Sequence, residues 1–71
     1  MLVAKNGRYA IQSRMVSQLK VLEGDSEWVV VAIPFDTSEV SEYELAVCGT
    51  EEEATRILRG YAQSIENETC R

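Results

Sequence analysis

Cys48 is the residue of this chain best placed for nucleophilic chemistry. It stands just before residues 50–54, where Thr50 and Glu53 have the spacing of a helix-capping box. A helix that begins there could lower the pKa of a nearby thiol. No basic residue adjoins Cys48, however, and the glutamates at 51–53 oppose a thiolate. We therefore interpret Cys48 as a buried packing residue and keep a small enzyme with a reactive thiol as an alternative.

The other reactive residue types form no catalytic or metal-binding pattern. The chain has no histidine, which removes the imidazole base of Ser-His-Asp and Cys-His arrangements. Consecutive residues of a helix diverge by about 100°, so the glutamates at 51–53 do not converge on one ion. The glycines are isolated from one another, which excludes a glycine-rich phosphate loop. We expect no enzymatic activity, no metal site and no cofactor.

Charge is divided unevenly along the chain, whose net charge is −5. Every acidic residue lies at position 23 or later. The basic residues before that position are Lys5, Arg8, Arg14 and Lys20. An acidic protein is a poor general binder of nucleic acid, because that binding depends on neutralising phosphates. The four basic residues could still form a local patch, so weak nucleic-acid binding is the alternative function. The simpler interpretation is that these residues are ordinary solvent-exposed positions on strands.

The length of 71 residues predicts one small domain, 1–71, with a marginal core of its own. A domain of this size buries only about 60% of its unfolded surface, and such domains often depend on disulfides, metals or a partner subunit. The two cysteines, Cys48 and Cys70, do not make a disulfide framework. We find no secretory leader, so we expect a cytoplasmic protein with reduced thiols. The apolar run at 28–35 is too short to cross a bilayer, and no membrane association is expected.

Turn signals and hydrophobic periodicity predict an α+β fold: a curled antiparallel β-meander of four to five strands with one C-terminal helix packed on one face. Asn6 and Gly7 predict a hairpin turn, and Pro34 ends a strand. The predicted strands are residues 2–4, 9–12, 16–23, 27–33 and 42–48, with the longest connection at 34–41. Residues 51–66 have helical periodicity, and the predicted apolar stripe consists of Ala54, Ile57, Leu58, Tyr61 and Ile65.

The predicted strand at 27–33 is apolar on both faces. One face carries Val29, Val31 and Ile33, and the other carries Trp28, Val30 and Ala32. One helix covers one face, and we expect it to cover the first, with Leu19 and Val21 beside it. The second face would then be the interface of a homodimer, because burying apolar surface is worth about 25 cal/mol per Å². A monomer in which Trp28 folds over the sheet edge is the alternative.

A strand at 43–48 that runs through Gly49 and Thr50 into the glutamates at 51–53 resembles the end of many small uncharacterised bacterial and phage-type proteins. The opening of the chain is similar to their first strands. The resemblance implies a β-meander with a closing helix and no catalytic residues; the loop at 34–41 is longer than in the usual pattern. We expect a non-enzymatic accessory or interaction module that self-associates through Trp28, Val30 and Ala32.

Overall fold

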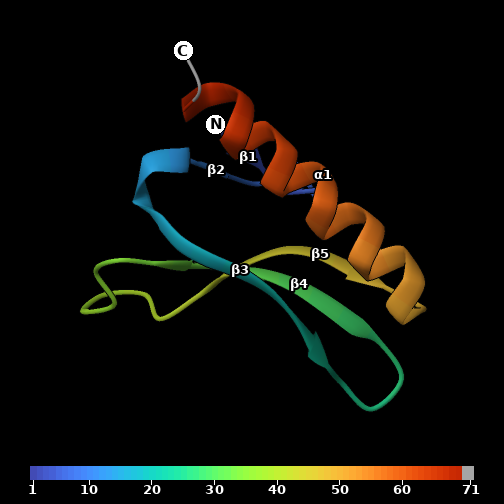
Figure 1. The fold of residues 1–71 in the computed structure, drawn as a ribbon. Coiled ribbons are helices and arrows are strands. Elements are labelled where there is room, and N and C mark those ends of the chain that lie inside the picture. The colour runs from blue at the N-terminus through green and yellow to red at the C-terminus, as the bar shows by residue number, and fades with distance from the viewer. Residues whose placement is uncertain (70–71) are drawn as a thin grey trace.

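Two antiparallel sheets and one long helix make up the fold in the computed structural model, which describes residues 1–69 (Figure 1). The elements are β1 (Leu2–Val3), β2 (Ala10–Ile11), the 3₁₀-helix η1 (Ser13–Met15), β3 (Val16–Glu23), β4 (Trp28–Pro34), β5 (Tyr43–Cys48) and α1 (Glu51–Thr69). β1 pairs with β2, and β3–β4–β5 form a three-stranded meander. The α+β class is thus confirmed, although the strands divide into two sheets.

The N-terminal hairpin, β1 and β2, is closed by the turn that the sequence predicts. Gly7 has a φ of 72°, a left-handed conformation that glycine adopts at little cost. The Ala4 amide donates to the Tyr9 carbonyl at 3.0 Å, and the Arg8 amide donates to Asn6 Oδ1 at 2.9 Å. The hairpin strands are two residues each and are therefore shorter than predicted.

The helix α1 covers the face of β4 opposite to the predicted one. Val30 and Ala32 have no exposed surface and lie in one buried cluster with Ala54 of α1. Trp28 packs against the same cluster. We call the face that carries Trp28, Val30 and Ala32 the inner face. The prediction that α1 leaves this face open for a partner is therefore wrong.

The pairing of β3 with β4 explains why the inner face is the one that is buried. Leu19 lies opposite Ala32, and Val21 lies opposite Val30. Residues directly opposite in an antiparallel pair share a face. Leu19 and Val21 therefore join the inner face, whereas the sequence predicts them beside Val29, Val31 and Ile33. Together they form a wider apolar surface for the helix to cover.

A β-bulge in β5 adds a large side chain to the inner face. Ala46 lies opposite Val30 and Glu44 lies opposite Val31, so β5 has one more residue than β4 at this point. The additional residue is Leu45, which is 1% exposed and belongs to the core cluster. Leu45 and Ala46 consequently both contribute to the core.

The helix α1 begins with the predicted cap and carries the predicted stripe. The Glu53 amide donates to Thr50 Oγ1 at 3.2 Å, one of the two hydrogen bonds of a capping box. The stripe residues that pack in or against the core are Ala54, Ile57, Leu58, Tyr61 and Ile65. No heavy atom lies within 4 Å of the position of a Cβ on Gly60, so this glycine does not serve a close approach to the sheet.

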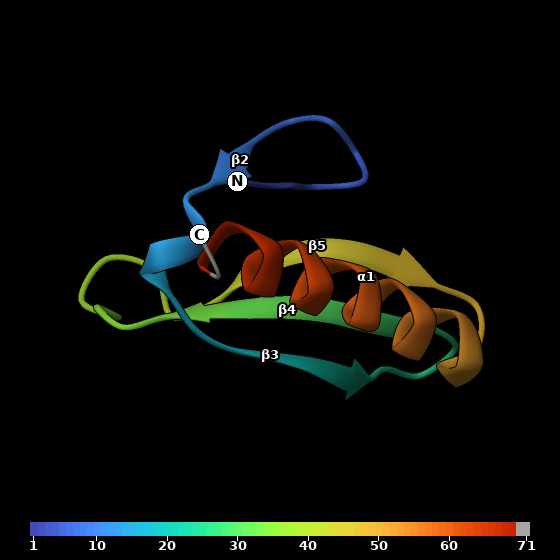
Figure 2. The ribbon, with the colours of Figure 1, turned by 45° about the horizontal axis from the view of Figure 1, so that its top comes forward.

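Hydrogen bonds attach the N-terminal hairpin to the helix. The Tyr61 hydroxyl of α1 donates to the Val3 carbonyl of β1 at 2.6 Å. Near the end of α1, Glu68 accepts hydrogen bonds from the N-terminal ammonium of Met1 and from the Ser13 hydroxyl. In Figure 2 the hairpin and the helix accordingly lie on the same side of the three-stranded sheet.

Two further hydrogen bonds attach the hairpin to β5. The Lys5 amide donates to the Leu45 carbonyl at 2.8 Å, and the Tyr9 hydroxyl donates to the Glu44 carbonyl. They occupy part of the outer edge of β5. The hairpin therefore covers part of this edge of β5. It does not extend over the face of the sheet that points away from α1.

We predict that alkaline pH destabilises the fold through Tyr61. Burial raises the pKa of Tyr61 above its ordinary value, and Tyr9 adds to the shift. The folded state thus holds this proton more tightly than the unfolded state. The stabilisation is complete below the unfolded pKa of about 10 and is lost as pH rises through the folded pKa. Urea denaturation at a series of pH values should show this decline.

The variant Tyr61→Phe is the matched test of that prediction. It removes the hydrogen bond to Val3 and should lower the free energy of unfolding at pH 7 by about 1 kcal/mol. It should also make the alkaline decline shallower, since one titrating group is gone. Unchanged stability at pH 7 together with an unchanged alkaline slope would contradict the assigned role of Tyr61.

Candidate interaction surface

The face of the three-stranded sheet that points away from α1 is the candidate functional site. Three rows of paired residues cross it, namely Gln18–Ile33, Lys20–Val31–Glu44 and Leu22–Val29–Val47. We call these eight residues the outer face. Within residues 1–69, neither the helix nor the N-terminal hairpin lies over it (Figures 1 and 2).

The outer face presents apolar side chains to solvent. Val47 is 49% exposed, and Leu22, Val29 and Ile33 are partly exposed. Phe35, directly after β4, is 73% exposed. Partly exposed apolar groups on adjacent strands, bordered by polar residues, are typical of association surfaces. The sequence predicts that one apolar face of β4 is left without a covering helix. The structure has such a face, but it is the one opposite to Trp28.

A hollow of about 270 Å³ lies in the outer face. Its lining combines apolar and acidic side chains, including Leu22, Val29, Val31, Glu23, Glu42 and Glu44. Such a lining suits a side chain with an apolar stem and a cationic end, because the stem packs on the apolar atoms while the charge meets a carboxylate. None of these lining side chains is a thiol, a hydroxyl or an imidazole.

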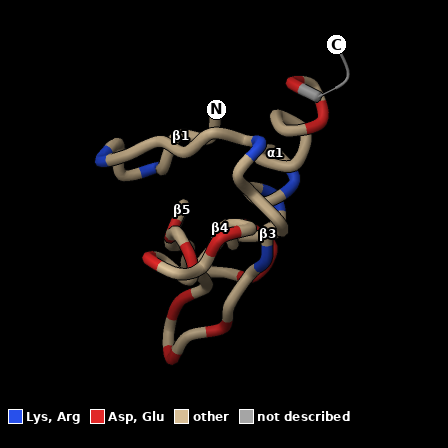
Figure 3. Tube along the Cα trace, turned by 90° about the vertical axis from the view of Figure 1, so that its left-hand side faces the viewer, with Lys and Arg blue, Asp and Glu red and all other residues tan. Residues whose placement is uncertain are grey.

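The four basic residues predicted as a patch do not share one surface. Lys20 belongs to the outer face, whereas the Lys5 ammonium lies 5.8 Å from the ring centroid of Tyr61 in α1. Arg8 lies in the N-terminal hairpin turn, and Arg14 lies in η1. Figure 3 shows basic positions distributed over the hairpin, α1 and β3. These four residues therefore form no continuous basic surface that would support nucleic-acid binding. That function stays an untested alternative.

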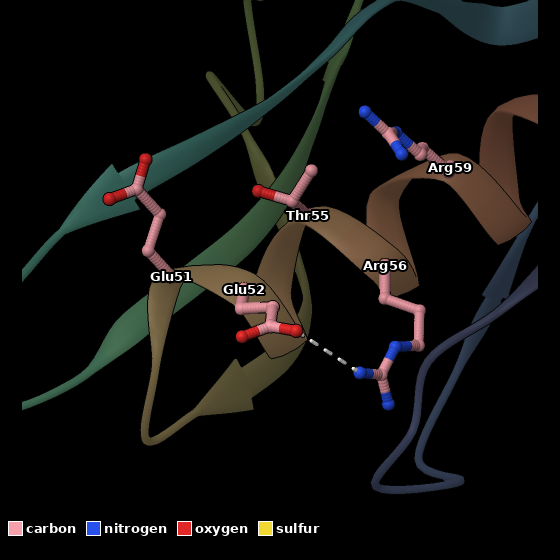
Figure 4. A pocket seen from close by; sticks show the side chains of 5 residues that line it. All are labelled: Glu51, Glu52, Thr55, Arg56 and Arg59. Atoms are coloured by element: carbon pink, nitrogen blue, oxygen red, sulfur yellow. Dashed lines mark ion pairs between the residues drawn. The ribbon is translucent and has the colours of Figure 1, made fainter.

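Glu51 and Glu52, at the start of α1, point in different directions, as helical geometry predicts (Figure 4). In Figure 4, Glu51 points away from Glu52, and Glu52 forms an ion pair with Arg56 at 3.8 Å. Both partners are largely exposed, so the pair contributes less than about 1 kcal/mol. Within residues 1–69, no group of three or more His, Cys, Asp or Glu residues is arranged to hold a metal ion.

Cys48 lies in the core rather than at a reactive surface. It is 4% exposed and belongs to the buried cluster. Desolvation raises the pKa of the Cys48 thiol, and the nearby Glu53 carboxylate raises it further. Both effects disfavour the nucleophilic thiolate, which supports the interpretation of Cys48 as a packing residue. Cys70 lies outside the described residues.

Comparison with known proteins leaves the surface without a described counterpart. No protein family matches this chain, and neither a curated protein nor a solved structure matches it. The resemblance to small bacterial and phage-type proteins therefore stays a prediction. As for membranes, none of the helical structure within residues 1–69 has the length and hydropathy to cross a bilayer.

Sequence reasoning missed Leu22, Glu44 and Val47 as members of the site. Leu22 was detectable, because it follows Val21 and interrupts the polar side of the alternation along β3. Glu44 and Val47 share a face only because the bulge at Leu45 intervenes, and strict alternation places them on opposite faces. No signal in the sequence marks that bulge.

We predict slow labelling of Cys48 by a thiol reagent in the native state. In a Cys70→Ser variant, burial and the raised pKa should make labelling at pH 7 at least about a hundred-fold slower than in denaturant, because the thiol reacts only when the fold opens. The labelling rate is measured as the increase in absorbance when the thiol reacts with an aromatic disulfide reagent. A native rate close to that of a free thiol would overturn the packing interpretation.

Proposed function

We propose that this protein is a non-enzymatic interaction module that self-associates as a homodimer through the outer face. This moves the interface predicted from the sequence to the other side of the same strand. The observation that carries the proposal is the composition of β4, which is apolar on both faces while α1 covers only the inner one.

The small size of the chain favours association. A domain of 71 residues has a limited core, and apolar area removed from water stabilises by about 25 cal/mol per Å². A second copy placed on the outer face would cover Val29, Ile33 and Val47, whose side chains are at least partly exposed. In a two-fold arrangement both subunits contribute the same surface, so the assembly is complete with two copies.

The non-enzymatic part of the proposal rests on the reactive groups of the chain. There is no histidine, and the Cys48 thiol is buried with a raised pKa. The hollow in the outer face is lined by apolar and acidic residues. These features support a role in binding rather than in covalent chemistry.

We predict that Val47→Glu converts the dimer to a monomer. Val47 is 49% exposed, so the substitution should leave the fold intact, while dimerisation would bury an unpaired carboxylate. The dimer dissociation constant should rise by roughly a hundred-fold or more. Light scattering coupled to size exclusion, with a reductant present, measures the mass, and circular dichroism checks the fold.

The matched control is Val3→Glu. Val3 is 56% exposed and lies on β1, away from the outer face. This variant adds the same charge and should remain a dimer, with a measured mass twice that of one chain. A wild-type protein that stays monomeric at millimolar concentration would end the proposal, and so would a Val47→Glu variant that dimerises as well as the control.

A further inference from the structure

We infer that the two subunits are related by a two-fold axis that runs parallel to β4 between the facing sheets, so that Lys20 of one subunit meets Glu44 of the partner subunit. This inference rests on the proposed homodimer and adds its symmetry and its polar contacts. It follows from the way in which charge is distributed over the outer face.

Opposite charges stand on opposite sides of the central strand. In the middle row of the outer face, Lys20 on β3 and Glu44 on β5 flank Val31 on β4. Val31 is 2% exposed, so the part of this row that a partner meets is mainly the two charged side chains. One edge of the outer face is therefore basic at its centre, and the other edge is acidic.

A two-fold axis along β4 places opposite charges together. The rotation keeps positions along the strands and exchanges the sides of the sheet, so that β3 of one subunit lies over β5 of the other. Lys20 then faces Glu44 of the partner subunit, and the same pair occurs a second time by symmetry. In the next row, Leu22 faces the partner's Val47, and Val29 faces the partner's Val29. Apolar groups thus meet apolar groups.

The other face-to-face axis, perpendicular to the strands, gives the opposite result. With the axis over the middle row, it keeps each strand on its own side, so that Lys20 faces the partner's Lys20 and Glu44 faces the partner's Glu44. Like charges that oppose each other across an interface are unfavourable. Charge therefore selects the axis that is parallel to β4.

The hollow in the outer face fits the same arrangement. Its lining includes the apolar residues Val29 and Val31 and the acidic residues Glu23, Glu42 and Glu44. Aligned sheets pack about 10 Å apart, a gap that long side chains bridge. A lysine from the opposite subunit can lay its methylene stem on the apolar lining and place its ammonium beside the carboxylates. The chain carries one lysine on its outer face, Lys20.

Charge reversal tests the axis. Lys20→Glu alone places two carboxylates together at each of the two symmetric contacts, and Glu44→Lys alone places two ammonium groups together. Each variant should raise the dimer dissociation constant by on the order of ten-fold at low salt. The double variant restores opposite charges and should return the constant to within roughly three-fold of wild type. Sedimentation equilibrium measures all four proteins.

The controls carry the same charge changes away from the outer face. Arg59→Glu on α1 and Glu39→Lys in the loop before β5 should each leave the dissociation constant close to the wild-type value. Arg59 belongs to the helix on the other side of the sheet, and Glu39 lines a hollow with Met15 and Tyr43 rather than the outer face. Added salt should shrink the effect of the single outer-face variants and leave the controls unchanged.

The outcomes separate this inference from the proposed function. If the wild-type protein dimerises and Val47→Glu disrupts it, but Lys20→Glu and Glu44→Lys have no effect, the outer face is the interface and the inferred axis is wrong. If both single variants weaken the dimer and the double variant does not recover, the direct pairing is wrong. Recovery in the double variant supports the axis parallel to β4.

Discussion

The packing of α1 on the inner face of β4 is the contact on which the rest of the structure depends. Val30, Ala32 and Ala54 form its fully buried centre. One helix can cover one face of a sheet, so the same contact determines which face stays open. The N-terminal hairpin is tied to α1 by the hydrogen bond between Tyr61 and Val3, and it adds to the covered side. The apolar side chains of Val29, Ile33 and Val47 on the outer face therefore stay at least partly exposed.

A second copy on the outer face would give a four-layer arrangement of helix, sheet, sheet and helix. Each β4 would then be covered on both faces, which is the usual environment of a strand that lacks polar alternation. The charges of Lys20 and Glu44 would define the relative orientation of the two sheets, while Val29 and Val47 would supply the apolar contact. Affinity and orientation would thus come from different residues of one surface.

Much of the fold could be predicted from local signals. The Asn6–Gly7 turn, the cap at Thr50 and the stripe on α1 each depend on neighbouring residues, and each is confirmed. The choice of face on β4 could not be predicted, because it depends on how β3 and β5 pair with it. The register that joins Leu19 to Ala32 and the bulge at Leu45 are long-range features. The prediction of which face of β4 the helix leaves uncovered is consequently wrong.

Intermolecular methyl contacts test the central claim most directly. In a sample that mixes isotope-labelled and unlabelled chains, isotope-filtered NOE spectra report only contacts between subunits. We expect such contacts from the methyl groups of Val29, Ile33 and Val47, and none from Val30, which lies beneath α1. Intermolecular contacts confined to other surfaces, or their absence at millimolar protein concentration, would contradict this expectation.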